Sequence, residues 1–317
     1  SAQPLQQAKT RGKPTIICVK RFNQYIQQQS SKGREVDTSS PTKKLAHHAY
    51  EIRKAILEMT TIAGSGHLGG SLSSVDILTT LFFYVLNYSE NPLQTIDNDR
   101  FILSCGHICP ALYATLAETG YLKKEELLTL RQLNSRLQGH PSHTDLPIVE
   151  TSSGSLGQGL SVALGKALAL RLKREKGRVY CFMSDGEQEE GSVWEAAMAA
   201  SHYCANNLIA IVDRNNLQIS GATENVIGLA PLGEKYRAFG WRVIEADGHN
   251  FASLINAFKE AREVKQRPSV IIAKTVLGKG VKSIENNYRW HGKVFSGQEL
   301  KEALSDLGTK GTTRSEK

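Results

Sequence analysis

Asp185 and Asn215 are the residues whose types and spacing first suggest chemistry. Asp185 follows the apolar run "VYCFMS" and precedes Gly186, and Asn215 follows the apolar run "LIAIVD" thirty residues after Asp185. One carboxylate, one amide oxygen and a nearby main-chain carbonyl form a weak oxygen site for Mg²⁺ or Ca²⁺, which a bound phosphate would complete. The pair therefore predicts a diphosphate ligand, and Gly186 would allow it to approach closely. The competing interpretation is that Asp-Gly and Asn-Asn are ordinary turns.

Four histidines form a second candidate group, because each stands beside a glycine or in a glycine-containing loop signal. They are His67, His107, His140 and His291. A single loop histidine is usually solvated or structural. Four of them at one edge of a sheet would suit proton transfer and hydrogen bonding to a polyhydroxylated substrate. The remaining five match no motif and are predicted to be structural: His47, His48, His143, His202 and His249.

An alternation of strands and helices has to position these residues. Short apolar runs predict strands at 100–105, 179–184, 208–213, 241–246 and 269–274. Helical patterns cover 40–60, 155–175, 192–205 and 251–266. This alternation predicts an α/β fold, a doubly wound and mostly parallel sheet with helices on both faces. Ligands of such folds lie at the carboxyl ends of the strands, where helices begin.

The net charge of +8 is concentrated near the N-terminus. Residues 1–44 carry nine Lys and Arg against Glu35 and Asp37, whereas the chain from Leu45 onward has 30 basic and 29 acidic residues. We therefore expect a basic and flexible arm over 1–41, one domain over 42–305 and a flexible tail over 306–317. A basic arm beside a nearly neutral domain argues against nucleic-acid binding by that domain.

Targeting signals and cysteine patterns are lacking. No apolar stretch reaches the length of a bilayer span, and the N-terminus does not follow the secretory pattern. We expect a cytoplasmic protein that makes no membrane contact. The five cysteines are odd in number and form no C-x-x-C pair, so disulfides and zinc sites are not expected.

Residues 181–217 resemble the thiamine diphosphate motif, in which G-D-G is followed about thirty residues later by N-N or N-x-N. Ser184 replaces the first glycine. Longer segments resemble transketolase, in that family's order along residues 45–305. They are "GSGHLGGSLSSVDILTTLFF", "DRFILSCGH", "LQGHP", "TSSGSLGQGLSVALG", "GEQEEGSVWEA" and "NNYRWHGK". The resemblance is to the domain that binds the cofactor diphosphate, which forms the N-terminal part of a fused transketolase.

The resemblance implies a role for each matching residue. The metal ligands would be Asp185, the Asn215 side chain and the Leu217 main-chain oxygen. Cofactor contacts would come from His107, Gly154, Ser155, Leu156, Gly186, Glu187, Asn215 and His291. The catalytic groups would be His67, His107, His140, His291 and Glu190, and the substrate contacts His67, His291 and Lys293. Glu190 and Glu195 would couple active sites across an interface, or be ordinary solvated carboxylates at a helix start.

The implied function is that of the N-terminal subunit of a two-subunit transketolase. It would transfer a two-carbon ketol unit from a ketose phosphate to an aldose phosphate through a thiamine diphosphate enamine. The partner would be a C-terminal subunit with the pyrimidine-binding domain, whose Glu activates the cofactor. Self-association as a homodimer or heterotetramer is also expected.

Other functions remain open on the sequence alone. One is a non-catalytic cofactor-binding or scaffolding subunit, and another is a subunit of the 2-oxoacid dehydrogenase or deoxyxylulose-phosphate synthase type. Three positions also depart from the family: Leu68 replaces its usual Pro, and Cys105 and Leu277 stand where animal-type transketolases carry Lys. None of the three is a proposed metal ligand or histidine.

Overall fold

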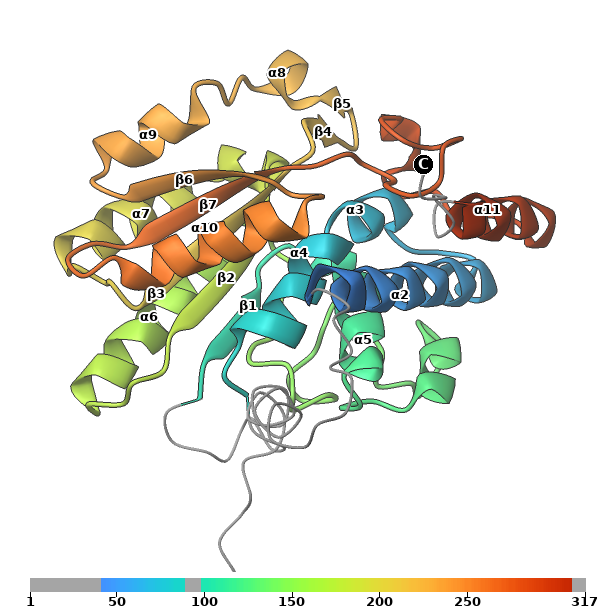
Figure 1. Cartoon of the computed structure of the whole chain (residues 1–317), viewed down its shortest axis with the longest axis horizontal. Helices are drawn as coiled ribbons and strands as arrows, with labels where there is room; N and C mark the ends of the chain where they lie inside the picture. The colour runs from blue at the N-terminus through green and yellow to red at the C-terminus, as the bar shows by residue number, and fades with distance from the viewer. Residues whose placement is uncertain (1–40, 89–97, 310–317) are drawn as a thin grey trace, which may run out of the picture.

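The computed structural model describes residues 41–88 and 98–309 (Figure 1). Most of the arm predicted over 1–41, and the end of the chain from residue 310, lie outside the described residues. The first described helix, α2, begins at Pro41. The last, α11, continues to Thr309, so the prediction of a flexible tail from residue 306 is wrong for residues 306–309.

All five predicted strands are present and form one parallel sheet in the order β1-β2-β3-β7-β6. They are β1 (Arg100–Leu103), β2 (Val179–Ser184), β3 (Leu208–Arg214), β6 (Arg242–Asp247) and β7 (Ser269–Lys274). Ser184 at the end of β2 is in register with Asp213 near the end of β3. The loops that follow these two strands therefore start side by side.

Helices cover both faces of the sheet, as predicted. Tyr180 and Phe182 of β2 pack in the apolar layer that contains α2, α4, α5 and α10. Cys181 and Met183 of the same strand pack in the opposite layer, with α6, α7 and α9. Alternate side chains of one strand thus point into two different cores. The two layers lie on either side of the strands in Figure 1.

The longer helices confirm the helical patterns of the sequence. The helix predicted over 40–60 spans three residues more at its C-terminal end, and the other three match within three residues at each end. Asn250 caps α10, its side chain accepting a hydrogen bond from Ser253 N at 3.0 Å. The longer helices are α2 (Pro41–Ala63), α5 (Cys109–Glu118), α6 (Gln158–Leu172), α7 (Gly191–His202), α10 (Phe251–Glu263) and α11 (Gly297–Thr309).

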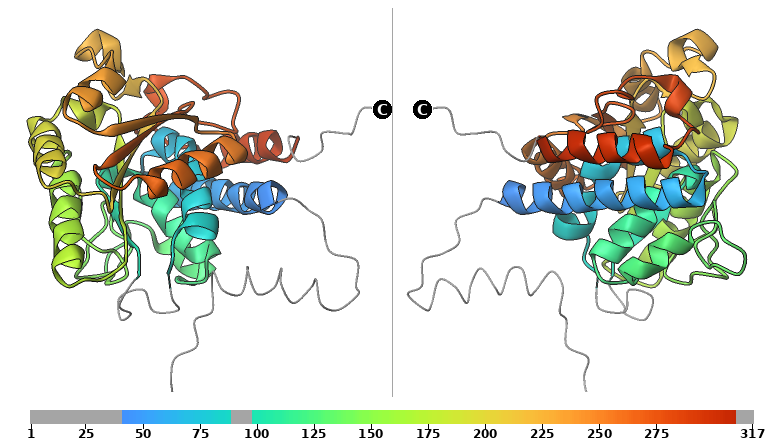
Figure 2. Two further views of the ribbon diagram at one scale, coloured as in Figure 1. Left: turned by 60° about the vertical axis from the view of Figure 1, so that its left-hand side comes forward. Right: turned by 90° about the vertical axis from the view of Figure 1, so that its right-hand side faces the viewer.

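Shorter elements connect these layers. They are α3 (Leu68–Ser73), α4 (Val75–Thr80), the π-turn η1 (Leu81–Val85), η2 (Gly106–Ile108), η3 (Lys124–Thr129), η4 (Gly186–Glu189), α8 (Thr223–Val226), α9 (Leu232–Ala238) and η5 (Tyr288–Trp290). A small antiparallel hairpin, β4 (Leu217–Gln218) and β5 (Gly221–Ala222), follows β3. Figure 2 shows α11 lying beside α2, so the two ends of the described chain pack together.

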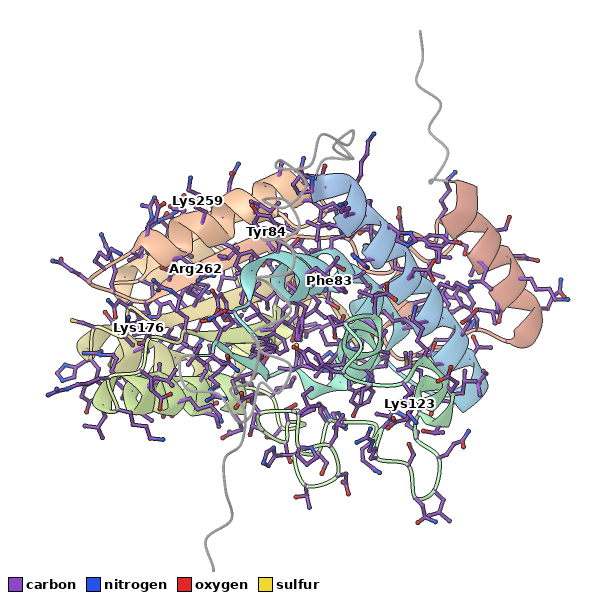
Figure 3. The ribbon with its side chains drawn as sticks, turned by 60° about the horizontal axis from the view of Figure 1, so that its bottom comes forward. Phe83, Tyr84, Lys123, Lys176, Lys259 and Arg262 are labelled. Carbon is purple, nitrogen blue, oxygen red and sulfur yellow. The ribbon has the colours of Figure 1, made fainter. Side chains whose placement is uncertain are left out.

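The amino edge of the sheet is closed by hydrogen bonds within the chain. Arg262 Nη1 donates to Val85 O at 2.7 Å, and Arg178 Nη2 donates to Arg262 O at 2.7 Å. Asp99 Oδ1 accepts the Arg178 N–H at 2.9 Å. Figure 3 views the molecule from below, with Arg262 and Tyr84 labelled at this end. The polar groups of this edge are bound to one another, which leaves the carboxyl edge as the place for a ligand.

Two further expectations concern membranes and cysteines. None of the helices in residues 41–88 and 98–309 combines the length and the apolar character that a bilayer crossing requires. The cysteines of those residues are free thiols, as predicted, with Cys204 exposed and the others buried. Cys18 lies outside the described residues.

Candidate active site

Asp185 and Asn215 meet at the carboxyl ends of the neighbouring strands β2 and β3. Asp185 is 1% exposed, and main-chain amides hold both of its oxygens. Gly186 N donates to Oδ1 at 2.8 Å, and Asn216 N donates to Oδ2 at 2.6 Å. The Asn215 Oδ1 accepts from Leu217 N at 3.0 Å. The loops themselves therefore orient the carboxylate and the amide that the sequence pairs.

The donor set fits a hard divalent cation. Asp185, Asn215 and Leu217 line the same cavity, and they offer carboxylate, amide and carbonyl oxygens of the kind that Mg²⁺ and Ca²⁺ prefer. Burial and the nearby Asp213 charge raise the pKa of Asp185 to about 7, and a cation would reverse this shift. The described residues hold no cluster of three His, Cys, Asp or Glu able to bind a metal. An ion here would therefore depend on amide, main-chain and phosphate oxygens.

The cavity above these strand ends has a volume of about 350 Å³. Its wall combines loops that are far apart in sequence. Gly186 lies against the β4–β5 hairpin, because a Cβ at this position would be 2.6 Å from Gln218 Oε1. The residues that line the cavity include His67, Cys105, His107, Gly154, Leu156, Asp185, Gly186, Glu187, Glu189, Glu190, Asp213, Asn215, Leu217, Gln218, Ile219 and His291.

The four predicted histidines form one cluster on the other side of this cavity. The ring centroid of His67 lies 5.0 Å from that of His107 and 5.6 Å from that of His291. The rings of His107 and His291 are 5.4 Å apart. His140 is exposed at the margin, 6.4 Å from His67, and does not line the cavity. Three loops and η2 thus bring together side chains separated by up to 224 positions (291 − 67).

Burial keeps these imidazoles neutral. It lowers the pKa of His67 to about 4 and that of His107 to about 3, and the neighbouring histidines add to the effect. The pKa values of His140 and His291 are also lowered, mainly by burial. A neutral imidazole has one donor and one acceptor nitrogen. Within residues 41–88 and 98–309, the Nδ1 atoms of His67 and His291 have no hydrogen-bond partner.

The Gly154–Leu156 segment follows the prediction in part. Gly154 and Leu156 line the cavity, whereas Ser155 is exposed and does not. A side chain at Gly154 would lie 3.5 Å from the His140 ring. At Gly157 the backbone has a φ of 81°, and a Cβ would lie 2.5 Å from Ser192 Oγ, so glycine is required there.

Glu187 lines the cavity, but its carboxylate serves the protein itself. Oε1 accepts hydrogen bonds from Ser104 Oγ and, at 2.8 Å, from Gly157 N. Oε2 accepts from Ser184 N at 3.1 Å. Burial raises the pKa of Glu187 to about 7. The side chain predicted to lie beside the diphosphate thus connects the loops after β1 and β2 with the start of α6.

The structure places the other predicted residues differently. Glu190 lines the cavity at the start of α7 and is exposed, as is Glu195. Lys293 is exposed and outside the cavity lining. Its Nζ lies 4.2 Å from the Trp290 ring centroid and 3.9 Å from Glu299 Oε1. In this arrangement the lysine is not directed at the cavity, contrary to the expected substrate contact.

Sequence reasoning missed three residues of this region. Asp213 is buried, and its carboxylate accepts hydrogen bonds from Ser73 at 2.5 Å and from Thr275, which ties α3 and the end of β7 to β3. Arg214 contacts Asp185. Arg131, with a φ of 59°, lies close enough for its charge to lower the pKa of His67 and His140. The first two directly precede Asn215, so the "DRNN" segment carried the signal.

The three positions that depart from the transketolase pattern are all buried. Leu68, Cys105 and Leu277 are 0% exposed. Leu277 packs on α3, where a Cβ at Gly69 would lie 2.9 Å from its Cγ. Burial raises the pKa of the Cys105 thiol far above its usual value. These positions therefore carry apolar contacts under the cavity, where a lysine would need a partner for its charge.

The histidines predicted to be structural are correctly placed outside the cluster. His249 links α4 with the loop after β7, its Nδ1 lying 2.8 Å from Asp76 Oδ2 and its Nε2 accepting from Val276 N at 2.8 Å. His143 Nδ1 lies 2.6 Å from Val149 O. His48 pairs with Glu118 at 2.9 Å. His47 and His202 are exposed.

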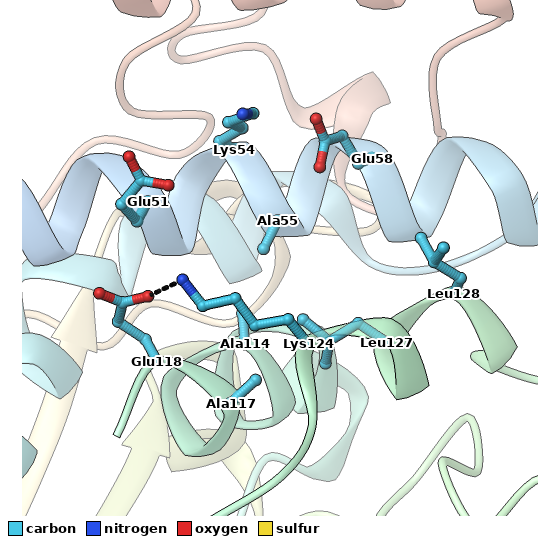
Figure 4. Close-up of a pocket in the computed structure, with 10 residues that line it drawn as sticks. All are labelled: Glu51, Lys54, Ala55, Glu58, Ala114, Ala117, Glu118, Lys124, Leu127 and Leu128. Atoms are coloured by element: carbon cyan, nitrogen blue, oxygen red, sulfur yellow. Dashed lines mark ion pairs between the residues drawn. The ribbon is translucent and has the colours of Figure 1, made fainter. Parts of the chain in front are cut away.

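A smaller cavity of about 150 Å³ between α2, α5 and η3 provides a contrast (Figure 4). Charged side chains of α2 rim it, and Lys124 pairs with Glu118 across it at 2.7 Å. These charges lie at the surface and neutralise each other. The larger cavity instead combines buried carboxyls and unpaired imidazole nitrogens, which is typical of a functional site.

Comparisons with known proteins agree with this geometry. Residues 45–315 match the family model described as "Transketolase, thiamine diphosphate binding domain". One of the two subunits of an apulose-4-phosphate transketolase from Phocaeicola vulgatus is 40% identical over 80% of this chain and 90% of its own length. A 6-deoxy-6-sulfo-D-fructose transketolase subunit from a Clostridium species is 39% identical over 84% and 97%.

Full-length transketolases are similar over a smaller share of their length. The human enzyme is 42% identical over 82% of this chain and 41% of its own length. The crystal structure of Campylobacter jejuni transketolase superimposes with a TM-score of 0.78 at 31% identity, covering 84% of this chain and 43% of that one. The chain thus spans about two-fifths of these longer relatives. It belongs to the transketolase family, through that family's thiamine diphosphate binding domain.

Proposed function

We propose that this chain is the N-terminal subunit of a two-subunit transketolase, which moves a two-carbon ketol unit from a ketose phosphate to an aldose phosphate. One observation carries the proposal: three neutral, largely buried histidines share a cavity with a carboxylate and an amide at the ends of adjacent strands. Diphosphate binding explains the second group but does not require the first. A reaction on a sugar requires both.

In this proposal, Asp185, the Asn215 side chain and the Leu217 carbonyl hold Mg²⁺ or Ca²⁺, and Gly186 lies beside the diphosphate. Gly154 and Leu156 line the path of the cofactor rings, with Ser155 at its margin. The bound cofactor supplies an electron sink for cleavage of a C–C bond next to a carbonyl. The protein orients the diphosphate end through amides that already hold Asp185 and Asn215.

The histidines act on the sugar. His67 and His291, whose Nδ1 atoms lack partners among the described residues, donate or accept hydrogen bonds from the ketose hydroxyls. His107 and His140 lie closer to the reacting carbonyl and exchange protons with it. Because burial keeps His107 neutral, it is available as an acceptor at neutral pH. Glu190, at the rim, couples this site to a second one across an interface.

A partner polypeptide completes the site. The two relatives that this chain matches over at least nine-tenths of their own length are named as transketolase subunits. We propose a C-terminal subunit with a pyrimidine-binding domain, together with self-association and a cytoplasmic location. Exposed apolar side chains of α6 and α7 support an assembly on this face, because they cover no core of their own: Val162, Leu172 and Met198.

The test is a transfer assay with xylulose 5-phosphate and ribose 5-phosphate, including thiamine diphosphate and Mg²⁺. We expect no transfer by this chain alone and robust transfer once the C-terminal polypeptide encoded beside it is added. Transfer by the chain alone would refute the two-subunit proposal. A complex that binds the cofactor and still transfers nothing from a panel of ketose phosphates would identify a scaffolding subunit instead.

A further inference from the structure

Arg214 is the residue immediately before the proposed metal ligand Asn215, at the carboxyl end of β3. Its side chain is 11% exposed and reaches across to β2, where Nη1 lies 3.3 Å from Asp185 Oδ2. The same nitrogen donates to Thr223 Oγ1 at 2.8 Å. One guanidinium group therefore contacts a proposed metal ligand and a residue at the far end of the β4–β5 hairpin.

The second guanidinium nitrogen extends this connection. Nη2 donates to Glu224 Oε1 at 2.6 Å. That carboxylate also accepts the main-chain N–H groups of Leu229 and Ala230, both at 3.2 Å. Arg214 and Glu224 together thus bind the start of α8, the segment that follows it and the end of β2.

The part of the chain between these contacts forms one wall of the cavity. It contains Leu217, Gln218 and Ile219, and Ile219 is 69% exposed. The hairpin has only two residue pairs, Leu217 with Ala222 and Gln218 with Gly221. A two-stranded hairpin of this size is at best marginally stable on its own. The wall therefore needs side-chain contacts that fasten it to the sheet.

Glu224 also makes the position of Arg214 compatible with a bound cation. An isolated guanidinium next to Asp185 would repel a divalent ion at the same carboxylate. The ion pair with Glu224 offsets this charge, so that the arginine can hold Asp185 without leaving a net positive charge at the site. The geometry is that of an outer contact that orients a ligand, a role often filled by hydrogen-bonded side chains around metal sites.

We propose that Arg214 is a positioning residue that fastens the 215–230 segment to Asp185 and so preforms the proposed divalent-ion and diphosphate site. This inference rests on the proposed function for the identity of the ligand. Its structural part, the fastening of the cavity wall, applies to the metal-free chain as well. Arg214 acts through Asp185 and the hairpin, and it contacts neither substrate nor the reacting atoms.

Two measurements on the full chain test this role. Hydrogen exchange of peptides covering 215–230, recorded in EDTA, reports whether the wall is fastened. Electron paramagnetic resonance of Mn²⁺ in the presence of thiamine diphosphate reports the affinity of the site. The variants are Arg214→Gln, the milder Arg214→Lys, and Arg237→Gln as a matched control. Arg237 pairs with Glu234 on the exposed surface of α9.

We expect Arg214→Gln to accelerate exchange in 215–230 and to weaken Mn²⁺ binding by about 10- to 100-fold, the range typical of an outer partner of a metal ligand. Arg214→Lys should lie between this variant and the wild type, because it keeps the charge but reaches fewer partners. Saturating Mn²⁺ and thiamine diphosphate should restore slow exchange. Arg237→Gln should match the wild type in both measurements.

Unchanged exchange in both Arg214 variants, or tighter Mn²⁺ binding in either, would overturn the proposal. Tighter binding would mean that the arginine competes with the ion. If Arg214→Gln fails to fold, the lysine variant decides. A wild-type chain that binds no Mn²⁺ with thiamine diphosphate, alone or with its partner, would count against the proposed function, and the exchange data would then decide the fastening role separately.

Discussion

The two halves of the cavity differ in how far this chain satisfies its own polar groups. In the carboxylate half, Asp185 and Asn215 are held by main-chain amides, and Arg214 adds an ion pair. In the histidine half, the rings contact one another, and two Nδ1 atoms find no partner within the described residues. The first half is preformed by its own loops. The second presents groups whose partners come from outside the chain.

Burial affects the charge of both halves. It raises the pKa of Asp185 and Glu187 to about 7 and lowers that of His67 and His107 to about 4 and 3. Both halves are thus driven towards their neutral forms. A divalent cation with a diphosphate would return charge to the carboxylate half only. The comparison therefore assigns ionic binding to one half and neutral hydrogen bonding to the other.

The largest effect should come from removing the carboxylate of the first half. Asp185→Ala deletes the one carboxylate among the proposed metal ligands, so we expect cofactor affinity to fall by more than the 10- to 100-fold typical of an outer partner. Calorimetric titration with thiamine diphosphate, with and without EDTA, measures this. Asp145→Ala, at an exposed loop position, is the control. Equal wild-type affinity with and without EDTA would refute the divalent-ion assignment.

A change in the second half should leave cofactor binding intact and affect turnover. His67→Ala in the assembled enzyme should lower kcat/KM by about 2–4 kcal/mol, because a hydrogen bond or proton transfer made in the transition state is lost. Calorimetry of the same variant should give the wild-type cofactor affinity. His47→Ala, on the exposed surface of α2, is the matched control. Unchanged kinetics would return His67 to a structural role.

The sequence predicted the parts of this site that depend on strand ends. Alternating apolar runs are enough to place Asp185 and Asn215 side by side, and family resemblance adds the histidines. Contacts between distant loops were not predictable. Glu187 lies within the recognised motif, yet its carboxylate is taken up by Ser104 and Gly157. The position of Lys293 depends on Trp290, whose ring lies under its ammonium group. No spacing rule encodes either contact.

The smallest predicted effect uses the titration of the histidine half. His107 has a folded-state pKa of about 3 against a usual value of 6.5, so the unfolded chain binds the extra proton between these values. Its contribution to stability is therefore fully present above pH 6.5 and is lost as the pH falls. Between pH 6.5 and pH 5 the loss reaches about 2 kcal/mol.

Urea unfolding of the wild type and of His107→Gln, at pH 7 and pH 5, isolates this contribution. Glu187 titrates with the opposite sign, because its raised pKa adds stability as the pH falls from about 7, but both proteins share it. The difference between them should therefore shrink at pH 5, since the wild type loses the histidine contribution and the glutamine variant has none to lose. A constant difference across the two pH values would mean that His107 is protonated in the folded protein. The histidine half would then be charged, and the contrast with the carboxylate half would fail.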